Sequence, residues 1–435
     1  MNTSNASQER HNLSILTGQG TLSTIAWTMA NPSIVLTYIA ISLDLPVLLA
    51  GLLVTFSQAA RLFTATFGTP VAERRIQKKR DLAITDMALA FSFIVALTAA
   101  AFGTQTIVAI SFILCILIVG AASEYQAIIT AGFYGNVLNS NSRNILMYSV
   151  MTLGGILASG LAWWAHRAFF HDPPFERHVV LVSIGVVCFV VASIVILLVR
   201  EYTIRSEQED HHGHQPHQRR SFIAIVETQL RDVYDKFSLL LTMEWFRSYL
   251  RIRLALLTVE LSVPFYAILA ALSHHESPKG LAALIISSAT ALIVSGPLWG
   301  AIGTKSTRLV MVLGAMMAAS AGLLLIVDHF IQLASAPYIH AVALFLVTIA
   351  VRGVTTARYL YFIDIAPEKY VVTGIGVSKV AVRIVGIGLS FVLASVAHIQ
   401  HVLWAILALA LINGVTAILA MRAPEAPRNG ETANA

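Results

Sequence analysis

Long apolar stretches follow one another along the 435-residue chain, separated by short polar segments. A helix needs about 20 mostly apolar residues to cross the hydrocarbon core of a bilayer, and each stretch is of that order. Six are expected in the first part of the chain, at 16–40, 46–67, 82–102, 105–130, 144–166 and 179–199. Six more follow, at 249–272, 280–300, 309–327, 337–360, 372–396 and 401–421. The pattern predicts an all-α membrane protein with twelve transmembrane helices.

The longest polar segment, 201–247, divides the chain into predicted domains at 1–200 and 248–435, each a bundle of six helices. Its first part is rich in charged residues and histidine, a composition typical of disorder. From Phe222 onward, apolar residues recur at helical spacing between charged ones. This periodicity predicts an amphipathic helix lying on the membrane surface.

Basic residues are distributed unevenly between the two sets of loops. The loop at 68–81 alone holds five, whereas the loops on the opposite side offer only Arg167, Arg177 and Lys279. Cytoplasmic loops carry the excess of Lys and Arg, so both termini and the segment 201–247 are predicted to be cytoplasmic. We expect a multi-pass protein of the bacterial inner membrane.

Composition narrows the function. Hydrophobic residues make up 57% of the chain and charged residues 12%, against about 25% charged in soluble domains. The net charge of +6 resides in loops, which fits anionic lipid head groups rather than nucleic acid. The sequence contains no HExxH, GxSxG or phosphate-binding Gly-x4-Gly-Lys motif. We therefore expect neither an enzyme nor a cofactor.

Three short motifs resemble those of the major facilitator superfamily. After the second predicted helix, Gly68 is followed by Glu73, Arg74, Arg75 and the basic residues 78–80. A degenerate copy occupies 296–305, and a Pro-containing segment occupies 364–370. The resemblance implies two six-helix bundles, a solute transporter that works as a monomer, and a gate formed by Glu73, Arg74 and Arg75. The alternative is that this basic run only fixes topology.

The direction of transport stays open at this point. The fifth predicted helix has three glycines, at 154, 155 and 160, but lacks the Gly-Pro pair that the family associates with antiporters. Efflux and uptake are therefore both compatible with the sequence.

Ionisable residues inside predicted helices are the sharpest functional signal, because each costs roughly 2.5–3.5 kcal/mol at the bilayer centre and is rarely without a role. In the family's fold, helices 3, 6, 9 and 12 lie outside and the others surround the cavity. All the deep charges fall on the cavity-lining helices; they are Arg61, Glu124, Glu260, Arg352, Arg358, Lys379 and Arg383.

The basic members predict the substrate class. Lys379 and Arg383 are four residues apart and share one helix face. Arg352 and Arg61, on two other predicted helices, are expected to bind the substrate together with them. The side chain of Arg358 is expected to extend to the membrane surface instead. The side chain of Arg61 either does the same or lines the cavity. With two acidic residues against four basic ones, the cavity is predicted to be positive and to favour a small organic anion.

Polar and acidic residues complete the predicted site. Gln19, Asn31, Tyr125 and Gln126 are expected to bind substrate through hydrogen bonds. Glu124 and Glu260 either neutralise arginines or bind protons during transport, since alternating access changes the surroundings of a carboxylate.

Two other functions remain open. His211, His212, His214 and His217 suggest a divalent-metal or metal-chelate transporter, although no predicted helix carries paired Asp and His ligands, and no metal site is expected. The second is a receptor or sensor built on a transporter fold. Cys115 and Cys188 lie in apolar runs and predict no disulfide.

Overall fold

The computed structural model describes residues 3–74, 77–200, 231, 234–274, 277, 279–331 and 337–423. Apart from turns, these ranges are helical. The first part of the chain forms α1 (Thr3–Met29), α2 (Val35–Ser42), α3 (Val47–Arg74), α4 (Lys78–Phe102), α5 (Gln105–Val137), α6 (Ser140–Ala168) and α7 (Pro174–Ile196). The second part forms α9 (Glu244–His274), α10 (Gly280–Gly303), α11 (Thr307–Ile331), α12 (Tyr338–Ile365), η2 (Glu368–Tyr370), α13 (Val371–Ile399) and α14 (Val402–Met421).

Within the described ranges, eleven helices are long and apolar enough to cross a membrane, and each coincides with one of the predicted spans. They are α3 to α7 and α9 to α14. The protein is thus an integral membrane protein with many membrane-spanning helices. Of the predicted surface helix, the described part is residue 231 and residues 234–241, which are helical; the remainder lies outside the described residues.

The first predicted span, 16–40, is the one that differs. The chain there is divided into α1 and α2 by a turn at residues 30–34. Pro32 lacks an amide hydrogen and disfavours helical backbone at Asn31. The Asn31 side chain accepts a hydrogen bond from the Ser33 amide at 3.0 Å, which stabilises the turn. An uninterrupted helix over 16–40 was therefore a wrong expectation, and a twelfth membrane crossing stays a prediction.

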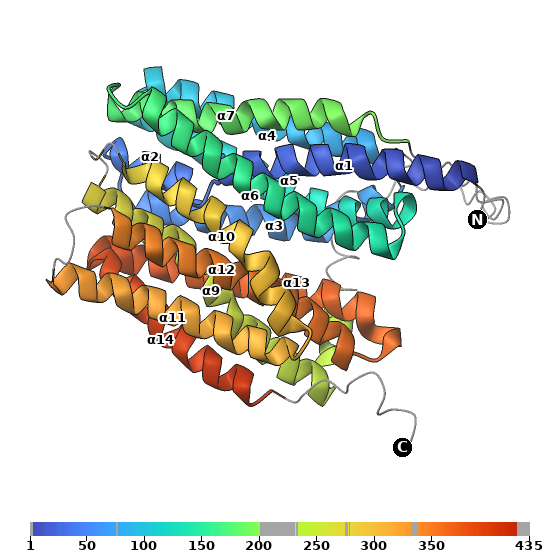
Figure 1. Ribbon diagram of the computed structural model, residues 1–435. Helices are drawn as coiled ribbons and strands as arrows, with labels where there is room; N and C mark the ends of the chain where they lie inside the picture. Colours follow the sequence, from blue (N-terminus) through green and yellow to red (C-terminus); the bar gives the residue numbers. More distant parts are fainter. Residues whose placement is uncertain are drawn as a thin grey trace.

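The helices lie in two groups, α1 to α7 in one and α9 to α14 in the other (Figure 1). Both chain termini lie at the same end of the helices, which we call the terminal end (Figure 1). The opposite end, where α2 meets α3 and α9 meets α10, is called the far end.

Small residues bring the two groups together. α3 packs along α13, and α6 packs along α10. A β-carbon at Gly51 of α3 would lie 2.6 Å from that of Ala394 in α13, and one at Gly155 of α6 would lie 2.9 Å from the Ala289 carbonyl oxygen in α10. Such distances are far below van der Waals contact, so only glycine permits this approach of the backbones.

Tyr38 joins the two groups at the far end. Its ring is fully buried, and its hydroxyl donates a hydrogen bond to the backbone carbonyl of His274, in the last turn of α9, at 2.8 Å. Gly280, at the start of α10, leaves room for this hydroxyl, because any side chain there would collide with it. The ring of His178 in α7 packs edge-on against Tyr38. One hydroxyl thus connects α2 to the α9–α10 corner.

Tyr38→Phe tests this connection. The substitution keeps the ring and removes a hydrogen bond worth about 1 kcal/mol, which corresponds to a roughly fivefold larger population with an open far end. Spin labels on the exposed positions Phe170 and Ile399, in a background with both cysteines replaced by serine, report the separation of the two groups.

We expect longer label distances to gain population in Tyr38→Phe. Tyr359→Phe is the matched control, because Tyr359 is exposed and lies on α12. Identical distance distributions in the two variants would show that Tyr38 does not hold the far end closed.

Candidate functional site

A buried carboxylate connects the two groups of helices in their middle. Glu124 of α5 is 4% exposed. Its Oε1 accepts a hydrogen bond from Lys379 Nζ at 3.2 Å and its Oε2 one from Arg383 Nη2 at 3.1 Å. Both cations come from α13 and, as their spacing predicts, share one face of that helix. Two cations of the opposite group therefore share the single negative charge of Glu124.

α3 contributes two further residues. Arg383 Nη1 donates a hydrogen bond to Gln58 Oε1 at 2.7 Å, and Gln58 is buried. The charges of Glu124, Glu260 and Arg383 all act on Arg61, whose buried Nε makes no hydrogen bond with the described residues. Arg61 thus belongs with these charges rather than at the membrane surface. Gln58 was not predicted as a site residue, because only ionisable side chains were considered in this span.

Glu260 forms a second ion pair, within the second group. Arg358 Nη1 of α12 lies 2.7 Å from Glu260 Oε1, and Thr355 donates to the same oxygen at 3.4 Å. The expectation that Arg358 reaches the membrane surface is therefore wrong. Thr355 and Arg358 lie one helical turn apart and face α9 together, which places the guanidinium on the carboxylate.

These residues form one electrostatic unit, which we call the charge cluster: Gln58, Arg61, Glu124, Glu260, Arg358, Lys379 and Arg383. Besides its partner Arg358, Glu260 is influenced by the charges of Arg383, Arg61 and Arg253, so the two ion pairs are coupled. The cluster holds four cations and two carboxylates. It therefore carries two positive charges in excess, on helices from both groups.

Four polar residues predicted for the site make their hydrogen bonds elsewhere. Gln126 Nε2 donates to Asp86 Oδ1 at 2.6 Å, and Gln19 Nε2 donates to Asp86 Oδ2 at 3.4 Å. Tyr125 donates to Asp81 at 3.2 Å. Asn31 stabilises the α1–α2 turn instead. Two residues along a helix amount to about 200° of rotation, so Gln126 points away from the face that carries Glu124.

Two buried charges were missed by the sequence analysis. Asp86, the fifth residue of the predicted span 82–102, is 1% exposed and accepts hydrogen bonds from the two glutamine amides. Arg253 of α9 is also buried, and its Nη1 donates to the Tyr249 hydroxyl at 2.8 Å and to Ser378 Oγ at 2.9 Å. Arg253 lies four residues after Tyr249 inside a predicted span, a spacing that would have revealed the pair.

Arg352 lies in the middle of α12, with an exposed side chain, and forms no ion pair with a described residue. The structure thus does not join it to the charge cluster. The side chains of Glu73 and Arg74, the whole of Arg75, and the histidines at 211–217 lie outside the described residues. Within the part of the chain that is described, no three His, Cys, Asp or Glu residues are placed to hold a metal ion. Both cysteines are buried and free.

Two helical groups that meet at a buried charge cluster define a polytopic membrane transporter. The sequence model of the family described as Major Facilitator Superfamily matches residues 16–387. The chain belongs to this family, and it is a transporter rather than an enzyme. Its relatives include Uncharacterized protein Rv2209 of Mycobacterium tuberculosis and Uncharacterized protein Mb2232 of Mycobacterium bovis. Each is 23% identical over 368 residues, covering 84% of this chain and 68% of the relative.

Solved transporters share the fold. The inward-open xylose transporter XylE from E. coli aligns with a TM-score of 0.66 at 10% identity, covering 97% of this chain and 98% of its own. The nucleoside transporter NupG gives 0.62 at 14% identity, covering 94% and 98%. A POT family transporter in complex with a thioalcohol-conjugated peptide gives 0.63 at 12% identity, covering 94% and 95%. At such identities the similarity establishes the fold alone.

Glu124→Gln tests the shared carboxylate. The substitution leaves Lys379 and Arg383 without their counter-charge, and we expect it to lower the free energy of unfolding by about 1–3 kcal/mol. Thermal unfolding of the purified protein measures this. Glu244→Gln is the control, because Glu244 is exposed at the start of α9. Equal unfolding midpoints in the two variants would contradict the importance of the shared pair.

Proposed function

We propose that this protein is a secondary-active transporter that moves a small organic anion across the membrane by alternating access. The observation that carries the proposal is the sharing of Glu124 by Lys379 and Arg383. Two cations of one group of helices depend on one carboxylate of the other, and they would accept another carboxylate or a phosphate in its place.

The excess charge supports an anionic substrate. Four cations and two carboxylates lie within one cluster, largely removed from water. Desolvated charges are costly unless they are compensated, so an anion that enters between the helices lowers the energy of the cluster. A cation would raise it. The structural neighbours are transporters of xylose or nucleosides and a transporter in complex with a conjugated peptide, so the proposed specificity for an anion rests on the residues of this chain.

The position of the pair supports coupling between binding and movement. Glu124 lies on α5, whereas Lys379 and Arg383 lie on α13. When the two groups of helices rock apart, this ion pair has to break. A substrate anion that binds Lys379 and Arg383 stabilises the broken state, which makes its binding favour the conformational change.

Proton coupling follows for Glu124 in particular. A carboxylate that has lost both cations in a low-dielectric site is stabilised by taking up a proton. Glu260 differs, because its partner Arg358 belongs to the same group of helices and stays with it during the movement. We therefore assign the proton-binding role to Glu124 and a structural role to Glu260.

We also propose the membrane location, the topology and the domain organisation of the protein. The loop charges and the mycobacterial relatives support the inner membrane of a bacterium, with both termini cytoplasmic. Residues 201–247 would link two six-helix domains of a monomer. The gate at Glu73, Arg74 and Arg75 stays a prediction from the family resemblance.

A ligand screen tests the substrate class. Thermal unfolding of the purified protein is followed with organic anions, organic cations, sugars and divalent metals. We expect an anion class to stabilise the wild type and Arg80→Ala, which removes an exposed arginine outside the cluster. Arg383→Ala should bind that anion roughly 10–100-fold more weakly, since it removes a charged hydrogen bond.

Two outcomes would contradict the anion proposal. One is stabilisation only by cations or sugars. The other is stabilisation only by divalent metals, which would favour the metal or metal-chelate alternative.

Flux in proteoliposomes tests proton coupling. Glu124→Gln should abolish anion flux driven by a pH gradient while keeping exchange of labelled for unlabelled anion, because a permanently neutral side chain carries no proton. Glu260→Gln should keep the response to the gradient. Gradient-driven flux that survives in Glu124→Gln would refute the assignment.

A further inference from the structure

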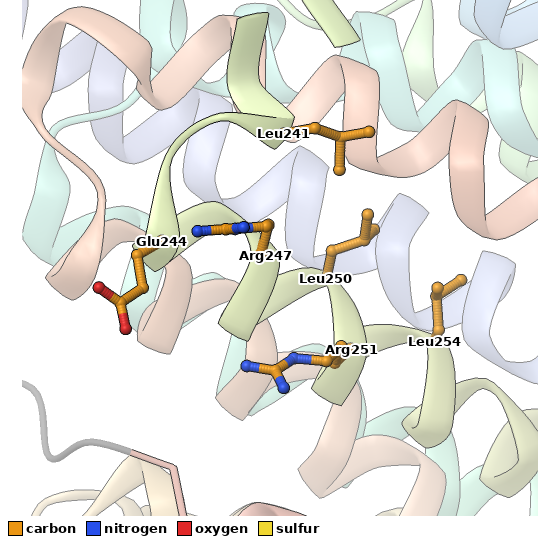
Figure 2. Close-up of a pocket in the computed structure, with 6 residues that line it drawn as sticks. All are labelled: Leu241, Glu244, Arg247, Leu250, Arg251 and Leu254. Atoms are coloured by element: carbon orange, nitrogen blue, oxygen red, sulfur yellow. The ribbon is translucent and has the colours of Figure 1, made fainter. Parts of the chain in front are cut away.

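A cavity of about 390 Å³ lies at the terminal end of α9 (Figure 2). Its described lining comes from the first turns of this helix and the residue shortly before it: Leu241, Glu244, Arg247, Leu250, Arg251 and Leu254. Neither the charge cluster nor the family motifs include any of these residues.

The cavity lies on the side of α9 that faces away from the charge cluster. Arg247, Arg251 and Leu254 recur at intervals of four and three, so they share one helix face. Arg253 and Glu260 are rotated by more than 100° from that face, toward α12 and α13. The cavity is therefore separate from the proposed transport site.

α14 covers the same face of α9 farther along the helix. Thr258 donates a hydrogen bond to Asn413 of α14 at 2.6 Å, and Thr416 of α14 donates to the Ala255 carbonyl at 3.3 Å. Toward the terminal end, Arg247 and Arg251 are exposed. The cavity thus begins where α14 no longer covers α9, at the outside of the bundle.

The lining has a polar side and an apolar side. In the view of Figure 2, the guanidinium groups of Arg247 and Arg251 extend to the left, and the three leucine side chains lie to their right. The two arginines are one helical turn apart, a spacing at which both reach a single phosphate. Leu250 and Leu254 lie one helical turn apart on α9, and Leu241 lies just before the helix. Because Glu244 offsets one of the two arginines, the lining carries one excess positive charge.

We propose that this cavity binds one acidic phospholipid. The phosphate of its headgroup is held by Arg247 and Arg251, and part of one acyl chain lies against Leu241, Leu250 and Leu254. Lipid fits better than free phosphate because half of the lining is apolar. The cavity also lies at the end of a membrane-spanning helix, where lipid head groups are found, and basic residues there attract anionic lipid.

Native mass spectrometry of the purified protein tests this proposal. The protein is titrated with phosphatidylglycerol or with phosphatidylcholine carrying the same acyl chains. We expect one phosphatidylglycerol to bind more tightly than phosphatidylcholine. Arg247→Ala with Arg251→Ala should weaken that binding roughly 30-fold, because each basic residue near the membrane surface contributes a factor on the order of five in anionic lipid affinity, and the two factors multiply.

Two further variants separate charge from folding. Arg80→Ala with Arg200→Ala removes two exposed arginines of the first group of helices and should leave binding unchanged. Arg247→Lys with Arg251→Lys keeps both charges and should retain the preference for phosphatidylglycerol. Displacement by glycerol phosphate, which lacks acyl chains, should require much higher concentrations than displacement by lipid.

Several results would overturn the proposal. They are equal binding of the two lipids by the wild type, an equal loss in the Arg80 and Arg200 variant, or displacement by glycerol phosphate at concentrations similar to those of lipid.

Discussion

The structure depends on the cost of placing charge inside a membrane. Lys379 and Arg383 stand on one face of α13, and neither lipid nor a packed apolar core stabilises them. Glu124 lowers that cost, but it comes from α5, in the other group of helices. The ion pairs of Glu124 with Lys379 and Arg383 exist only while the two groups are in contact, so these ion pairs oppose the separation of the groups. A transporter needs such an interaction, because the substrate has to replace something in order to drive movement.

The other contacts between the groups fit this arrangement. Gly51, toward the far end, and Gly155, in the middle of α6, bring backbones together, and Tyr38 closes the α9–α10 corner with one hydrogen bond. These contacts are small and neutral, so they can form and break at little cost. The charged contact lies in the middle, where a substrate would reach it. Glu260 and Arg358, in contrast, stay within one group, and their pair is independent of the distance between the groups.

Much of the fold could be predicted from the sequence, because a membrane-spanning helix needs an apolar stretch of known length. The exception is the first span, where Asn31 and Pro32 signal a break whose effect on the helix depends on the local turn. The shared face of Lys379 and Arg383 also followed from their spacing. Their partner did not, since Glu124 lies 255 residues before Lys379 and no local pattern links them.

The polar residues show where sequence reasoning ends. Gln126 lies near Glu124 in the sequence, but helical rotation turns it toward Asp86. Arg358 could be judged only by its distance from the helix end, and that judgement failed because Glu260 stands opposite on α9. Asp86 is held by side chains of α1 and α5, and Arg253 is held partly by a side chain of α13, so their burial depends on packing that periodicity does not specify.

The central claim is that an anion displaces Glu124 from Lys379 and Arg383 and that the freed carboxylate takes up a proton. Infrared difference spectroscopy on addition of the stabilising anion tests this most directly, because a protonated carboxyl group has a carbonyl band that a carboxylate lacks. The account predicts that such a band appears in the wild type and in Glu260→Gln and is absent in Glu124→Gln. Its absence from the wild type, or its persistence in Glu124→Gln, would contradict the account.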